Sequence, residues 1–299
     1  MEPPPRDNAH SLKIALVITV LFLLVELAGG IVSGSLALVS DAGHMFSDVL
    51  SLILSLAAIS LAAQLPTKER TYGFKRAEIF AAFANSLLLI GASAGILFES
   101  YHRALNPAPV QSGIMGVVAL AGLAANVSVA FLLHRSHNLN VRSAFLHVIG
   151  DAVSSVAVIA AAVWIALTGQ VIADPILSAI IAILIVYSAG NLLRETIVIL
   201  LQFTPKDVDF DTVVSDMMSV EGVSGVHHVH LWSLSSDIYV LDAHVYSCEQ
   251  ETEKIELVKR EIKKRLEKYN INHSTLEFEC EECRNCTIVE TPEEKSKRA

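Results

Sequence analysis

Two histidine–aspartate pairs, each spaced four residues apart, stand inside long apolar stretches of this sequence. His44 and Asp48 lie in SDAGHMFSDVL, and His147 and Asp151 lie in FLHVIGDAVSS. Residues at i and i+4 share one face of a helix, so each pair offers one imidazole and one carboxylate side by side. Together they supply two nitrogen and two oxygen ligands, a set that suits tetrahedral zinc. Cadmium and cobalt compete for such ligands, because affinity alone discriminates poorly among these ions.

The negative charge of the two aspartates also indicates a bound cation. A carboxylate at the centre of a bilayer costs at least ~2.5–3.5 kcal/mol on insertion scales, and the apolar stretches carry no Lys or Arg in their middle. Interhelical hydrogen bonding is the alternative role for such residues. A divalent cation would supply the missing charge, and ligands must lose their protons to bind it. Since imidazole titrates near pH ~6.5, the sequence predicts exchange of the ion for protons.

The elements that carry these pairs read as membrane helices. The chain has 299 residues, of which 53% are hydrophobic, and its mean hydropathy is +0.51. Six apolar stretches reach the ~20 residues that cross a bilayer as a helix, and most lack the polar face of a soluble helix. We therefore expect a multi-pass α-helical membrane protein with six transmembrane helices. The stretches are 14–33, 36–65, 79–101, 113–133, 145–167 and 176–201.

The loops predict the orientation. The loop at 67–76 holds four Lys and Arg residues, and the loop after the fourth span holds Arg135 and Arg142. The loops on the other side hold none. Basic loops face the cytoplasm, so both termini of a six-span chain are expected there too.

Asp174 precedes Pro175, a pattern that predicts an N-cap and a first-turn proline for the sixth span.

The rest of the chain has a different composition. From Pro205 onward there are 12 Lys and Arg against 20 Asp and Glu, and this acidic balance argues against nucleic acid as a partner. Periodicity predicts the order helix, strand, strand, helix, strand, which makes a small α+β domain. We expect a cytoplasmic N-terminal tail at 1–11, a transmembrane domain at 12–203 and a cytoplasmic domain at 204–299. The predicted elements of that domain are 209–220, 226–234, 238–246, 251–269 and 274–279.

This C-terminal part is rich in metal-binding residue types. Cys280, Cys283 and Cys286 form a C-x2-C-x2-C pattern, which can supply part of a zinc site in a reducing compartment. A redox role or a solvated tail is the alternative. Strand periodicity puts His228 and His230 on one face of the strand at 226–234 and His227 on the other. Ordinary hydrogen-bonded positions in a sheet are the alternative for these histidines.

Several segments, taken together, form a pattern that is highly specific for one protein family. They are SLALVSDAGHMFSDVLSL (35–52), YGFKRAEIFAAFANSLLL (72–89), AFLHVIGDAVSSV (144–156), the Asp-Pro pair at 174–175, VHHVHLWSLSS (226–236) and LDAHV (241–245). In these segments the chain resembles the zinc-transporting branch of the cation diffusion facilitator family. It is most similar to prokaryotic zinc or cobalt–zinc–cadmium efflux transporters and to vertebrate vesicular zinc transporters.

The resemblance implies proton-coupled export of zinc from the cytoplasm by a homodimer embedded in membrane lipid. His44, Asp48, His147 and Asp151 match the positions that hold the transported ion in the family. The resemblance also implies a metallochaperone-like αββαβ fold for the cytoplasmic domain. For a prokaryotic chain it implies the plasma membrane.

Within the cytoplasmic domain, the resemblance also implies a structural or regulatory zinc ion. His244 and His273 match family ligands, Cys280 sits where some members use an acidic ligand, and His227 is a further candidate. Cys283 and Cys286 are candidates for a second ion, together with an N-terminal residue such as His10 of the neighbouring subunit.

Two rival functions come from other classes. A membrane zinc sensor or receptor would bind the ion without moving it. An intramembrane metalloenzyme would need an open coordination position for water and a general base. Four protein ligands fill a tetrahedron and the sequence has no HExxH, so we do not expect an enzyme.

Overall fold

The computed structural model describes residues 6–62, 66–133, 139–248, 251–280 and 288–289. Within these ranges it leaves undescribed the side chains of residues 6–15, 48, 51–52, 54–60, 62, 132–133 and 139–147. The chain divides into two compact units, which we describe separately. The first contains residues 1–57 and 82–193, and the second contains residues 58–81 and 194–299.

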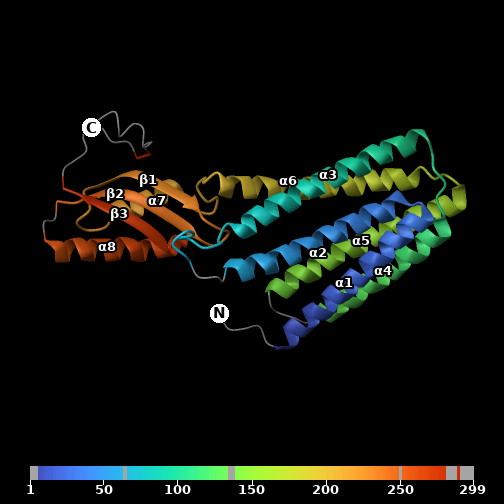
Figure 1. Cartoon of the computed structure of the whole chain (residues 1–299), viewed down its shortest axis with the longest axis horizontal. Helices are drawn as coiled ribbons and strands as arrows, with labels where there is room; N and C mark the ends of the chain where they lie inside the picture. Colours follow the sequence, from blue (N-terminus) through green and yellow to red (C-terminus); the bar gives the residue numbers. More distant parts are fainter. Residues whose placement is uncertain (1–5, 63–65, 134–138, 249–250, 281–287, 290–299) are drawn as a thin grey trace. The chain divides into compact units, whose positions relative to one another are not determined.

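Six long helices account for the apolar part of the chain (Figure 1). Each predicted span falls within one of them, apart from residues at the ends of the second and sixth. Several helices begin earlier than hydropathy predicts, because their first turns are polar. The helices are α1 (Arg6–Ser33), α2 (Leu36–Ala62), α3 (Ala77–Leu105), α4 (Ser112–Leu133), α5 (Leu139–Thr168) and α6 (Ala173–Leu200).

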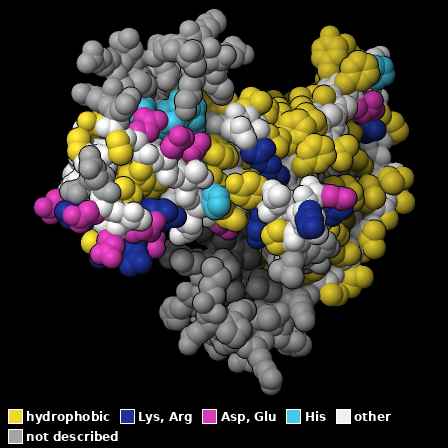
Figure 2. All heavy atoms as spheres, turned by 60° about the vertical axis from the view of Figure 1, so that its left-hand side comes forward, with side chains coloured by type: hydrophobic (Ala, Val, Ile, Leu, Met, Phe, Trp, Pro, Cys, Tyr) yellow, Lys and Arg dark blue, Asp and Glu magenta, His cyan; other side chains and the backbone are white. Residues whose placement is uncertain are grey.

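Apolar side chains cover much of the surface of these helices, as the face drawn in Figure 2 shows. Leu88 is 66% exposed, and Phe98 and Tyr187 are each 72% exposed. A protein in water does not leave so much contiguous apolar area uncovered. Five of the helices have described segments long and apolar enough to cross a membrane, and α2 completes the predicted six. The chain is therefore a multi-pass membrane protein, as the sequence predicted.

Polar side chains are instead turned inward in the helical unit. Glu26 is 1% exposed, and its carboxyl group lies close to that of Asp41 on α2. Asn126 on α4 donates to Ser155 Oγ on α5, at 3.4 Å. Since hydrocarbon offers no hydrogen-bond partners, polar groups at this depth bind one another across helices. Asn126 therefore links α4 to α5 by a hydrogen bond.

The second unit is an α+β domain in the order αββαβ, as predicted. The three strands form one sheet in the order β1-β2-β3, with β1 and β2 antiparallel and β2 and β3 parallel. A parallel pair needs a crossover, and α8 provides it. The elements are α7 (Phe210–Met218), β1 (Gly225–Ser233), β2 (Tyr239–Tyr246), α8 (Thr252–Leu266), the 3-10 turn η1 (Glu267–Tyr269) and β3 (His273–Glu279).

The core of this domain lies between the sheet and its two helices. Met217 on α7, Ile262 on α8 and Leu241 on β2 are each fully buried in it. Asp209 caps α7 by accepting a 2.7 Å hydrogen bond from the Thr212 N–H. Hydrogen bonding from the Thr212 side chain, and then from this N–H, lowers the pKa of Asp209. Packing against the two helices holds the sheet rigid, so side chains elsewhere on its strands keep fixed positions.

An irregularity interrupts β1 at the histidines. The register between β1 and β2 shifts between His227 and His230, and His228 adopts φ +51°. The shift defines a β-bulge, which redirects side chains that strict alternation would place on opposite faces. At this bulge the Val229 N–H donates to Ile288 O at 2.7 Å, so a residue near the end of the chain covers the edge of β1.

Candidate metal centres

The membrane centre is built on α2 and α5. His44 lies in the third turn of α2, and Asp151 lies near the middle of α5. His44 Nε2 and Asp151 Oδ1 are 4.0 Å apart, and Asp151 is 8% exposed. Ligand atoms on one tetrahedral zinc ion stand about 3.3 Å apart, from Zn–N and Zn–O bonds of about 2.0–2.2 Å. A side-chain shift of less than 1 Å would therefore bring this pair onto one ion.

A second contact shows how the two helices are aligned. Ser154 Oγ donates to Asp41 Oδ1 at 2.6 Å. Asp41 lies three residues before His44, and Ser154 lies three residues after Asp151, so the two helices run antiparallel along this contact. Asp41 therefore shares the helix face of His44 and does not cap α2.

The other two predicted ligands fall where the helices continue. Asp48 lies one turn after His44 in α2, and His147 lies one turn before Asp151 in α5. The i, i+4 spacing on continuous helices is thus present in both pairs. The side chains of Asp48 and His147 lie outside the described residues.

A cavity of about 110 Å³ opens beside His44. Ser47, Asn85 and Ser188 give it three further polar lining residues, from α2, α3 and α6. The predicted orientation puts the lining residues of α3 and α6 toward the cytoplasmic ends of those helices. The cavity is large enough for water molecules.

Asp174 holds the beginning of α2 in position. It is fully buried on α6 and accepts from Ser35 Oγ at 2.5 Å, from the Leu36 N–H at 2.8 Å and from the Ala37 N–H at 3.1 Å. The sequence predicted an N-cap for α6, and this prediction was wrong. Asp174 lies inside α6 and caps α2 from a distance of more than a hundred residues in sequence, satisfying the free N–H groups of its first turn.

The turn between α1 and α2 is fixed from the other side. Gly34 has φ +71°, and a Cβ at this position would lie 2.9 Å from Pro109 O. Arg103 Nη1 donates to Gly34 O at 2.6 Å, while its Nε bonds Glu99 at 2.8 Å. The start of the helix that carries His44 is therefore tied to α3 and α6.

The second centre lies at one end of the three-stranded sheet. His227 and His244 are cross-strand partners on β1 and β2, and Glu279 ends β3. His244 Nδ1 lies 2.6 Å from Glu279 Oε1, and His227 Nε2 lies 3.2 Å from Glu279 Oε2. One ligand atom from each of the three lies within 4.8 Å of the others. We call His227, His244 and Glu279 the sheet cluster.

Two further side chains border the sheet cluster. Glu277 Oε2 lies 3.3 Å from His244 Nε2, and the His228 ring lies 4.8 Å from the His244 ring. Histidine and acidic side chains gather on one face in Figure 2. Two imidazoles and a carboxylate suit zinc, and a three-residue set leaves a coordination position for another group.

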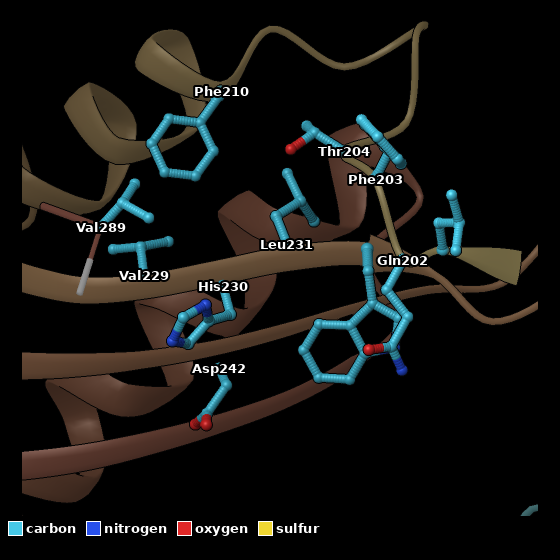
Figure 3. Close-up of a pocket in the computed structure, with 11 residues that line it drawn as sticks. Gln202, Phe203, Thr204, Phe210, Val229, His230, Leu231, Asp242 and Val289 are labelled. Atoms are coloured by element: carbon cyan, nitrogen blue, oxygen red, sulfur yellow. The ribbon is translucent and has the colours of Figure 1, made fainter. Parts of the chain in front are cut away.

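The β-bulge corrects the predicted faces of β1. Strict alternation puts His228 apart from His227, yet both rings lie near His244, with centroids 4.8 and 5.3 Å away. The His230 ring still packs against His228, with centroids 4.8 Å apart, as the prediction of a shared face implies. His230 also pairs with Asp242 and lines a separate pocket of about 530 Å³, where Figure 3 shows it beside Val229 and Leu231.

The structure separates other predicted ligands from the sheet cluster. His273 opens β3 opposite Val240, at the far end of the strand from Glu279, and its Nε2 lies 3.4 Å from Tyr72 Oη. Cys280 follows Glu279 and is an exposed free thiol. Cys283, Cys286 and the side chain of His10 lie outside the described residues.

Sequence reasoning missed Glu279, which contacts both histidines of the sheet cluster. The predicted ligand was the Cys280 thiolate, at a position where some family members use an acidic residue, and the carboxylate that contacts the histidines lies one residue earlier. The alternation in STLEFE was the available signal, because it puts Glu277 and Glu279 on one face of the strand.

Comparisons with known proteins cover both units. Residues 12–201 match the cation efflux transmembrane domain, and residues 205–280 match the cytoplasmic domain of cation efflux proteins. The chain is 37% identical to the "Cadmium, cobalt and zinc/H(+)-K(+) antiporter" of Bacillus subtilis, over 92% of this chain and 90% of that protein.

Two other relatives are similar over comparable lengths. Identity is 38% to "Metal cation efflux system protein CzcD" of Cupriavidus metallidurans, over 93% of this chain and 89% of that protein. It is 36% to "Zinc transporter ZitB" of Escherichia coli, over 94% of this chain and 90% of that protein. With six long helices and these matches along its length, the chain belongs to the cation efflux family, the cation diffusion facilitators.

Proposed function

We propose that this protein is an antiporter that exports zinc from the cytoplasm in exchange for protons, with cadmium or cobalt as further substrates. The observation that carries the proposal is the approach of His44 and Asp151 from two membrane helices, at 4.0 Å. An imidazole and a buried carboxylate facing each other in an apolar bundle are suited to a divalent cation. The relatives named as zinc transporters and antiporters support this reading.

The transport site takes two further ligands from the same helices. The contacts between residues 41 and 154 and between residues 44 and 151 follow one antiparallel register. Extending that register by one turn pairs position 48 with position 147. We therefore retain Asp48 and His147 as the ligands that complete a His2Asp2 site.

Proton coupling follows from the ligand chemistry. The site with two ionised aspartates and two neutral histidines carries a charge of −2, and zinc neutralises it. Protons taken up in the absence of zinc reduce the same charge, so ion and protons compete for one set of atoms. The cavity beside His44 would hold water next to this ligand.

The remaining organisation is part of the proposal. We infer from the basic loops that both termini face the cytoplasm, and we propose domain boundaries of 12–203 for the membrane part and 204–299 for the cytoplasmic part. The protein acts as a homodimer in a lipid bilayer, the plasma membrane for a prokaryotic chain. In the cytoplasmic domain, the sheet cluster holds a structural or regulatory zinc ion.

Metal flux into proteoliposomes tests the proposal. We expect zinc accumulation that depends on an imposed pH gradient and is abolished by Asp151→Ala or His44→Ala. Glu195→Gln is the matched control, because it removes an exposed carboxylate from the end of a membrane helix. Zinc flux that runs at the same rate without a pH gradient would indicate a channel, and zinc binding without flux would indicate a sensor.

A further inference from the structure

A second pocket of the C-terminal unit lies outside both metal centres. It has a volume of about 310 Å³ and is lined mainly by the loop before α3 and by the end of β1. Lys75 and Arg76 supply two positive charges, and no acidic residue lines it. We call this the basic pocket. Its other lining residues are Tyr72, Gly73, Gln202, Trp232 and Leu234.

The charges of the basic pocket are not compensated within the described part of the chain. Neither Lys75 nor Arg76 has an ion-pair partner there, whereas Arg70 in the same loop stacks over the Phe74 ring at 4.5 Å. The Nε of Arg76 is buried and has no hydrogen-bond partner among these residues. A buried guanidinium N–H left unbonded is costly, so the site suits an anion.

The position of the basic pocket in the chain identifies the kind of anion. Arg76 immediately precedes α3, and Gln202 lies two residues after α6 ends, so both stand where membrane helices leave the bilayer. Lipid headgroups lie at this depth, and tyrosine and tryptophan side chains favour it. Tyr72 is held against His273, with ring centroids 5.7 Å apart.

We propose that the basic pocket binds the phosphate of an anionic phospholipid headgroup. Arg76 would donate its unbonded Nε–H to a phosphate oxygen, and Lys75 would add a point charge beside it. Tyr72 and Trp232 would contact the glycerol region. This lipid would join the loop before α3 to the segment after α6 and to β1.

Native mass spectrometry of the delipidated full-length protein tests this inference. The probes are phosphatidylglycerol and phosphatidylcholine with identical acyl chains. We expect the protein to retain phosphatidylglycerol preferentially. Since each cation near a lipid surface is worth about fivefold in binding, Lys75→Gln with Arg76→Gln should reduce that preference about 25-fold. The swap Lys75→Arg with Arg76→Lys conserves charge but removes the Arg76 Nε–H, so it should keep the electrostatic part of the preference and lose the part due to that hydrogen bond.

The control removes the same charge elsewhere. Lys68→Gln with Lys206→Gln changes two exposed cations that do not line the basic pocket, and the preference should persist. An equal loss in this control, or an unchanged preference in the pocket variant, would refute the assignment. Lys75→Gln alone, with an expected fivefold loss, serves if the double variant fails to fold.

Inorganic phosphate distinguishes the two sources of the anion. We expect millimolar phosphate to leave bound phosphatidylglycerol in place, because the lipid also has apolar contacts. Displacement by phosphate at that concentration would show that the basic pocket binds a free anion and would overturn the lipid as its ligand.

Discussion

At the scale of single residues, Glu279 joins the two histidines of the sheet cluster through its two carboxylate oxygens. Its Oε1 lies 2.6 Å from His244 and its Oε2 lies 3.2 Å from His227. A metal ion at this position would take one carboxylate oxygen and one nitrogen from each imidazole.

Glu279→Gln should therefore lower the zinc content of the purified protein. The amide is isosteric but neutral, so it binds zinc poorly while preserving the shape of the site. Metal content measured by plasma mass spectrometry should fall by one ion per subunit, with the membrane site still able to bind. Glu277→Gln is the control, since Glu277 contacts His244 alone. Undiminished zinc in the Glu279 variant would remove it from the ligand set.

Tyr269 gives a prediction on pH. Its hydroxyl donates to Asp216 Oδ2 at 2.7 Å, and this bond raises the pKa of Tyr269. A raised pKa means that the bond contributes stability at every pH below the unfolded value of about 10 and loses it as the pH rises through the folded value. Burial also raises the pKa of Tyr239, so the ultraviolet absorbance of phenolate should show late-titrating tyrosines, and Tyr269→Phe should remove one of them. An early titration of all tyrosines would contradict this.

The sequence contained most of the information about these residues, though not all. His44 and Asp151 each belong to a pair with i, i+4 spacing, which predicts a helix. Helical neighbours are close in sequence, so the pattern can be read from the sequence alone. Glu279 and the position of His228 depend instead on strand pairing and on a bulge. Those features arise from contacts between segments far apart in the chain, which periodicity does not record.

At the scale of elements, α2 depends on a carboxylate from another helix. Asp174 accepts two backbone N–H groups and one hydroxyl at the start of α2, with no exposure to solvent. Hydrocarbon offers no substitute for these bonds. The direction of α2, and hence the position of His44 opposite α5, relies on this contact.

Asp174→Ala should therefore weaken transport through the metal site. We expect a raised KM for zinc and an altered ratio of zinc to cadmium flux, because His44 and Asp151 would no longer be held at one separation. Asp174→Asn should retain part of both, since it keeps one acceptor oxygen. Ser35→Ala removes the hydroxyl bond to Asp174 and the bond that the hydroxyl accepts from the Leu38 N–H, but it keeps both backbone bonds to Asp174, so it is the milder control. A uniform fall in the amount of folded protein, with KM and selectivity unchanged, would reduce Asp174 to a purely structural role.

The elements themselves were largely predictable. Apolar length gave the six membrane helices, and periodicities of 3.6 and 2 gave αββαβ for the C-terminal domain. The capping of α2 by Asp174 was not predictable, because the two partners lie in different helices and a local Asp-Pro pattern fits a cap equally well.

At the scale of the whole molecule, the C-terminal unit matches a domain of cation efflux proteins over residues 205–280. We expect the purified protein to form a dimer. Light scattering in detergent should give a protein mass twice the 32.3 kDa of one chain. A mass of one chain at all concentrations would contradict the dimer.

The hydrogen bond from Val229 to Ile288 affects how readily the domain aggregates. β1 is an edge strand, and a bare strand edge invites pairing with other chains. Ile288 occupies one of its donors, so this residue shields the strand edge at Val229 from intermolecular sheet growth. Shortening the chain before Ile288 would expose a template for aggregation beside the histidines.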